Sequence, residues 1–146
     1  MGVLRRLFGR DKRVGLFVDG PNVVREEFDI DFDELQAIAS EEGTVAISRL
    51  YLDEHATPNL VRAAEERGFD VVTTSGDVDV RLAVDLTAAA VAGTVDTVVV
   101  VSRDGDFKPA LERAAEAGAR TVAVAPGEHG RSDALRNAAN HSLTLE

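Results

Sequence analysis

Aspartates follow two apolar stretches of this 146-residue chain, at the points where each stretch ends. Asp19 follows the first stretch, Asp104 and Asp106 follow the second, and Asp79 comes after a turn between them. Carboxylates that lie close together repel one another, and a hard divalent cation such as Mg²⁺ or Mn²⁺ relieves that repulsion. These residues therefore predict metal-assisted attack of water on a phosphate ester.

The elements that must position these carboxylates are apolar strands alternating with helical patterns, most of which end at glycine. Asp31 and Glu34 form a capping box for one helix, and Ser132 is the expected cap of the last. We expect strands at 14–18, 44–52, 69–73, 95–101, 120–125 and 142–145, and helices at 21–28, 32–41, 58–67, 80–92, from 106 or 107 to Gly118, and 133–139. This alternation predicts a doubly wound α/β sheet, whose strand ends and ligands share one rim.

The strand-end aspartates meet on that rim if the first strand lies beside the strand at 95–101. Asp19, Asp104 and Asp106 would then share one site. Asp79 and Asp85 are six positions apart, and six positions along a helix turn the side chain by about 600°, so the two point about 120° apart. We favour Asp79 as a ligand and leave Asp85 open as a supporting residue or a deeper ligand.

Four polar residues are further candidates for substrate contact. Asn22 and Ser102 could bind a phosphate or orient a carboxylate, although turn and capping roles explain them equally well. Arg131 and Ser132 stand at the start of a predicted helix, where free backbone N–H groups favour an anion. A capped helix with a solvated arginine is the equally simple interpretation.

The composition is acidic, with 26 acidic residues against 16 basic ones and a net charge of −10. Only two residues are lysine, so the composition resembles that of proteins from halophilic archaea. At molar salt the screening length falls to about 3 Å, so this charge does not exclude RNA or DNA as a substrate. The absence of cysteine excludes a disulfide scaffold, a thiolate zinc site and a cysteine nucleophile.

The first thirteen residues differ from the rest because they hold five of the basic residues and one acid. We place a basic N-terminal tail at 1–12, ahead of one domain at 13–146. The tail could be an amphipathic turn that contacts nucleic acid or a membrane surface, or a loosely docked terminus. No apolar run approaches the roughly 18 residues of a membrane helix, and no signal-peptide pattern is present, so we expect a cytoplasmic protein without a membrane span.

Ordered motifs in the chain resemble the NYN domain of the LabA-like kind, which has a PIN-like fold. They read Phe17-Val-Asp-Gly-Pro-Asn22, Asp77-Val-Asp-Val-Arg-Leu-Ala-Val-Asp85, Val101-Ser-Arg-Asp-Gly-Asp-Phe107 and Ser132-x-x-Leu135, and the resemblance covers residues 13–146. It implies a Rossmann-like three-layer α/β/α sandwich with a mostly parallel sheet, and a ribonuclease that depends on Mg²⁺ or Mn²⁺. It also implies an acidic catalytic and metal site at Asp19, Asp79, Asp104 and Asp106, with Asn22, Asp85 and Ser102 as auxiliary residues.

The chain departs from the family pattern at three positions near these motifs, one of which is Asp77, which stands where a lysine-containing turn is common. Arg103 replaces the glycine of the usual Ser-Gly-Asp and could clamp a phosphate, and Asn140 stands where an aspartate is expected. The leading prediction is a nuclease that cleaves RNA phosphodiesters with metal-activated water. The alternative is a non-catalytic RNA- or protein-binding regulatory module that keeps the fold. A homo-oligomer or a protein partner also stays open.

Overall fold

The computed structural model describes residues 12–23, 31–127 and 133–145. Most of the predicted tail, residues 24–28 of the first predicted helix, Arg131 and Ser132 lie outside these ranges. The elements in chain order are β1 (Arg13–Asp19), α2 (Gly20–Val23), α3 (Phe32–Glu42), β2 (Thr44–Asp53), α4 (Pro58–Glu66), β3 (Asp70–Thr74), α5 (Val78–Val91), β4 (Thr97–Val101), the 3₁₀ turn η1 (Gly105–Phe107), α6 (Lys108–Glu116), β5 (Arg120–Ala125), α7 (Asp133–Ala138) and β6 (His141–Thr144).

The strands form one sheet in the order β3-β2-β1-β4-β5-β6, and every neighbouring pair is parallel. This arrangement confirms the predicted α/β fold. Strands β2 and β3 lie on one side of β1, and β4, β5 and β6 lie on the other. The carboxyl ends of β1 and β4 therefore mark the topological switch point, where ligands bind in open α/β sheets.

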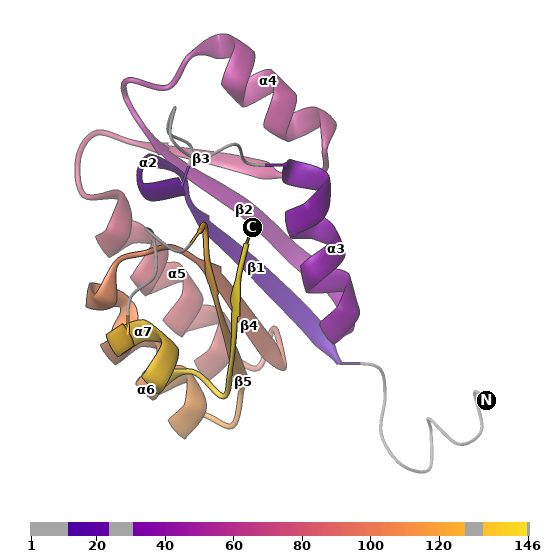
Figure 1. Cartoon of the computed structure of the whole chain (residues 1–146), viewed down its shortest axis with the longest axis vertical. Coiled ribbons are helices and arrows are strands. Elements are labelled where there is room, and N and C mark those ends of the chain that lie inside the picture. Colours follow the sequence, from indigo (N-terminus) through magenta and orange to yellow (C-terminus); the bar gives the residue numbers. More distant parts are fainter. Residues whose placement is uncertain (1–11, 24–30, 128–132, 146) are drawn as a thin grey trace, which may run out of the picture.

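Helices cover both faces of the sheet and make three layers (Figure 1). Side chains alternate along each strand. Phe17, Tyr51 and Val100 point to the face that α5, α6 and α7 cover. Leu16 and Leu50 point to the opposite face, which α3 and α4 cover. Each face of the sheet therefore has its own apolar core. Alternate residues along a strand pack against opposite helical layers.

Local signals explain where several elements begin and end. Asp31 caps α3, because its carboxylate accepts hydrogen bonds from the backbone N–H groups of Asp33 and Glu34. The helix α5 begins at Val78, two residues before the predicted start, because Val78 is buried in the core and Asp77 takes the cap position. This earlier start places Asp79 in the first turn of α5.

The last strand is β6, which begins one residue before the predicted edge strand. It pairs in parallel with β5, so the sheet is entirely parallel in the part of the chain that the structure describes. Over the same ranges, no helix is long and apolar enough to cross a membrane.

Candidate metal centre

The carboxyl ends of β1 and β4 are joined by a buried hydrogen bond. Val18 pairs with Val101, so the next residues, Asp19 and Ser102, follow at the same level of the sheet. Asp19 is two residues after Phe17 on β1, so its side chain lies on the same face of the sheet as that of Phe17, the face that α5 covers. The Ser102 hydroxyl donates to the Asp19 carboxylate over 2.9 Å, and both side chains are buried. The two strand ends are thereby held together at the switch point.

The loop after β4 is ordered by its own polar side chains. The Ser102 hydroxyl also accepts a hydrogen bond of 3.0 Å from the backbone N–H of Asp104. Asp104 in turn accepts a hydrogen bond of 2.9 Å from the backbone N–H of Asp106 and so caps η1. Phe107 is buried in the core below the loop. The loop therefore holds both aspartates at fixed backbone positions.

Three carboxylates from two elements converge beside this loop. One oxygen atom each from Asp79, Asp104 and Asp106 lies within 4.8 Å of the others. Asp79 and Asp104 are half-buried, and Asp106 is exposed. The structure thus brings together three of the four residues that were predicted to form the acidic site.

The chemistry of these donors fits a hard divalent cation. Carboxylate oxygens are the ligands that Mg²⁺ and Mn²⁺ prefer, and Mg²⁺ keeps several water molecules in its shell. At metal–oxygen distances of about 2.1 Å, two ligands of one ion lie no more than about 4.2 Å apart. The observed limit of 4.8 Å is close to this value, so small side-chain rotations bring the three oxygens within range. The group could bind one metal ion.

Asp19 is not part of this group of oxygens. It is connected to the group through Ser102, whose hydroxyl contacts both the Asp19 carboxylate and the backbone of Asp104. Groups that hold metal ligands in place from behind tune the metal strongly. The geometry of Asp19 suits such a supporting role, and its predicted role as a direct ligand stays a prediction.

Gly20 lets the chain turn directly after Asp19. A Cβ atom at this position would clash with the carbonyl oxygen of Tyr51 and with the Cδ2 atom of Leu52. Real Cβ atoms do not approach so closely. A glycine is therefore required where the chain passes the end of β2.

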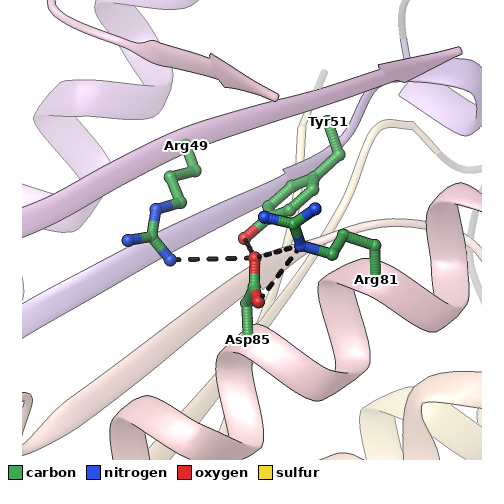
Figure 2. A network of polar contacts seen from close by, with 4 residues as sticks. All are labelled: Arg49, Tyr51, Arg81 and Asp85. Atoms are coloured by element: carbon green, nitrogen blue, oxygen red, sulfur yellow. Dashed lines mark hydrogen bonds and ion pairs between the residues drawn. The ribbon is translucent and has the colours of Figure 1, made fainter. Parts of the chain in front are cut away.

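Asp85 lies outside the acidic group, as the 120° rotation from Asp79 leads one to expect. Its carboxylate accepts a hydrogen bond of 2.8 Å from the Tyr51 hydroxyl and contacts Arg81 and Arg49 (Figure 2). Burial raises the pKa of the Tyr51 hydroxyl well above its ordinary value, and the hydrogen bond to Asp85 raises it further. Tyr51 therefore stays protonated and donates to Asp85.

None of the residues predicted from the sequence was Arg49, Tyr51 or Arg81, although the sequence carried signals for them. Arg81 and Asp85 stand at the i,i+4 spacing of a helical ion pair. Arg49 and Tyr51 are two apart on one strand, so they share a face. What the sequence did not reveal is that β2 packs against α5.

The remaining predicted site residues are placed only in part. Arg103 is half-buried between Ser102 and Asp104. The backbone of Asn22 lies in α2, but its side chain, like Arg131 and Ser132, is outside what the structure describes.

Asn140 lies at the opposite end of the sheet from the acidic group. Its carboxamide oxygen accepts hydrogen bonds from the backbone N–H and the hydroxyl of Thr121, at the start of β5. The backbone N–H of Asn140 donates to the same hydroxyl over 3.0 Å. The departure from the family pattern at Asn140 therefore concerns the joint between β5 and β6.

Comparisons with known proteins place the chain among relatives. An uncharacterized protein of Methanocaldococcus jannaschii is 38% identical over 135 residues, which are 92% of this chain and 56% of that protein. This chain thus spans little more than half the length of that relative. A crystal structure of a protein of unknown function from Vibrio parahaemolyticus is similar with a TM-score of 0.82 and 21% identity, over 93% of this chain and 94% of that one. The likeness shows the same fold.

The model of the NYN domain matches residues 13–146, which contain the whole sheet and the acidic group. The chain belongs to the NYN domain family, within the PIN-like superfamily.

Proposed function

We propose that this protein is a Mg²⁺- or Mn²⁺-dependent nuclease that cleaves phosphodiester bonds of RNA. The observation that carries the proposal is the convergence of the Asp79, Asp104 and Asp106 carboxylates at the rim of the sheet. NYN domains are generally ribonucleases, which supports RNA as the substrate. The position of the group beside the switch point of the sheet also supports a ligand site.

Some residues of this site would bind the cation or the substrate, and others position the residues that bind. Asp79, Asp104 and Asp106 would hold the cation. A divalent cation bound there supplies positive charge that activates a water molecule and stabilises the charge that develops on the phosphate. Asp19 and Ser102 fix the backbone of Asp104 from below. Arg103 follows Ser102 directly, and we assign it to the contact with the substrate phosphate.

The test is an RNA cleavage assay with purified protein and Mn²⁺. Wild-type protein should cut single-stranded or structured RNA, and EDTA should stop it. Asp79→Asn and Asp104→Asn should each lower the rate by at least about 100-fold, since even partners behind a metal ligand are worth about 10- to 100-fold. Asp70→Asn is the matched control, because Asp70 is exposed at the amino end of β3, away from the acidic group.

Cleavage that persists in EDTA, or that survives both substitutions at the acidic group, would overturn the proposal. RNA binding without cleavage, unaffected by EDTA and by the same substitutions, would favour the alternative of a regulatory module. The departure from the family pattern at Asn140 gives this alternative little support, because Asn140 is hydrogen-bonded to Thr121 at the far end of the sheet.

A further inference from the structure

A second cluster of charged residues lies between β2 and α5, outside the acidic group (Figure 2). The Asp85 carboxylate is its centre. The Nε atom of Arg81 lies 3.3 and 3.1 Å from the two oxygens of that carboxylate. Arg49 reaches it with a terminal nitrogen at 3.8 Å, an ion pair that is longer than a hydrogen bond. Two guanidinium groups therefore share one carboxylate.

The cluster carries a net positive charge within an acidic chain. Two arginines and one aspartate leave one positive charge, whereas the whole chain is at −10. The Arg81 side chain is 52% exposed and the Arg49 side chain 34%, while Asp85 is 18% exposed. The cations face solvent, and the carboxylate that holds them lies beneath. An anion can therefore reach the guanidinium groups more easily than it can reach Asp85.

Arg81 has hydrogen-bond donors that make no contact within the part of the chain that the structure describes. A guanidinium has five N–H donors in a fixed fork. Among the described residues, the contacts of Arg81 use only its Nε atom. Both terminal amino groups are thus left for a ligand, and they form the planar fork that binds phosphate oxygens in pairs.

The arginines are also held in place before any ligand arrives. Tyr51, which is fully buried, donates a hydrogen bond of 2.8 Å to Asp85 and fixes the orientation of that carboxylate. A carboxylate fixed in this way restrains both guanidinium groups. Ordering a long side chain on binding costs conformational entropy, and restraint in the free protein lowers that cost.

We propose that Arg49 and Arg81 form a phosphate-binding pair that holds the backbone of a single RNA strand beside the acidic group. The inference rests on the proposed function for the identity of the strand. Helix α5 carries a residue of each place: Asp79 is in its first turn, and Arg81 follows two residues later, about 3 Å further along the helix axis and about 160° around it, so the strand would cross the start of α5 to reach both. The pair binds the strand, and the acidic group acts on it.

The test measures RNA binding without cleavage. A fluorescently labelled 12-nucleotide oligouridine is titrated with protein in EDTA, and anisotropy gives the affinity at several KCl concentrations from 0.1 to 1 M. Each phosphate contact on a single strand contributes about 0.7 to the slope of log K against log salt. Arg49→Gln and Arg81→Gln should each lower the slope by about 0.7, and the double variant by about 1.4. At 0.1 M salt this corresponds to about 5-fold weaker binding per contact and about 25-fold for both.

Arg62→Gln is the matched control, since Arg62 is exposed on α4, on the opposite face of the sheet. It should leave the slope unchanged. Arg81→Lys keeps the charge and removes the fork, so it should keep most of the slope while it weakens binding. Thermal denaturation of each variant verifies that it is folded.

The inference is overturned if the folded double variant has the same slope and affinity as Arg62→Gln, or if wild-type protein does not bind the strand. The proposed nuclease activity fails separately. Wild-type protein that binds RNA through the pair but never cuts it would keep the inference and refute the nuclease. RNA cleavage by wild-type protein that does not depend on Arg49 and Arg81 would support the nuclease and refute the inference.

Discussion

Replacing Ser102 with alanine should destabilise the protein much more than an ordinary serine substitution. The hydroxyl donates to the Asp19 carboxylate and accepts from the backbone N–H of Asp104, and it is fully buried. A hydrogen bond to a charged group contributes about 1.5–3 kcal/mol, and a buried N–H left without an acceptor costs about 1–3 kcal/mol. We therefore expect Ser102→Ala to lower the free energy of unfolding by about 2.5 to 6 kcal/mol.

The measurement is urea denaturation followed by circular dichroism, with wild-type protein and both variants in the same buffer. Ser48→Ala is the matched control, because the Ser48 hydroxyl is half-buried and accepts one neutral hydrogen bond of 2.8 Å from Gln36. Its loss should cost about 0.5–1.5 kcal/mol. The two variants make the same chemical change, so the difference between them measures the coupling of Asp19 to Asp104.

A second readout separates the site from the fold. If the carboxylates bind metal as proposed, Ser102→Ala should weaken Mn²⁺ binding by about 10- to 100-fold, because Asp104 loses the contact that positions it. Isothermal titration with Mn²⁺ on protein that is still folded gives this ratio. Equal losses of stability for the two serine variants would refute the reasoning that this hydroxyl joins the strand ends.

Three further changes test other parts of the structure. Asn140→Ala should lower the free energy of unfolding by about 1–3 kcal/mol in urea denaturation, because Thr121 loses its acceptor, whereas Asn140→Asp keeps that oxygen. Both variants should keep the wild-type affinity for Mn²⁺. An altered affinity would contradict the placement of Asn140 at the far end of the sheet. Tyr51→Phe should cost about 1.5–3 kcal/mol at pH 7. The pKa of Tyr51 is raised above its ordinary value of about 10, so the unfolded chain loses this proton first and wild-type stability should fall above pH 10. The difference in free energy of unfolding between wild-type protein and Tyr51→Phe should therefore become smaller above pH 10. A difference that stays constant would contradict the raised pKa of Tyr51. Gly20→Ala should lower the free energy of unfolding by about 1–3 kcal/mol, because its Cβ would meet the carbonyl oxygen of Tyr51; unchanged stability would show that the turn can relax.

Much of the fold could be predicted because its signals are local. Asp31 caps α3 as its spacing from Glu34 indicates, and β5 has the predicted bounds of Arg120–Ala125. The neighbouring positions of β1 and β4 could only be assumed, since strand order depends on packing between distant parts of the chain. The structure supplies that order, and the strand-end aspartates then follow on one rim.

The acidic site was predicted less completely, for reasons of geometry. Asp79 lies in the first turn of α5, and its carboxylate lies near that of Asp104, because the helix begins at Val78, a buried core residue two positions before the predicted start. Periodicity is weakest at helix ends, where one buried residue decides the boundary. The role of Asp19 as a direct ligand stays a prediction, and its buried carboxylate accepts a hydrogen bond from Ser102.

The hydrogen bond between Asp19 and Ser102 can form only late in synthesis of the chain. The two residues are 83 positions apart in the chain. At 5–20 residues per second, a ribosome needs roughly 4 to 17 s to make the segment between them. During most of that interval β1 can meet β2, but its other neighbour, β4, has not yet been synthesised. A newly made chain therefore carries Asp19 long before it carries Asp104, and the acidic group assembles only after most of the domain has been synthesised.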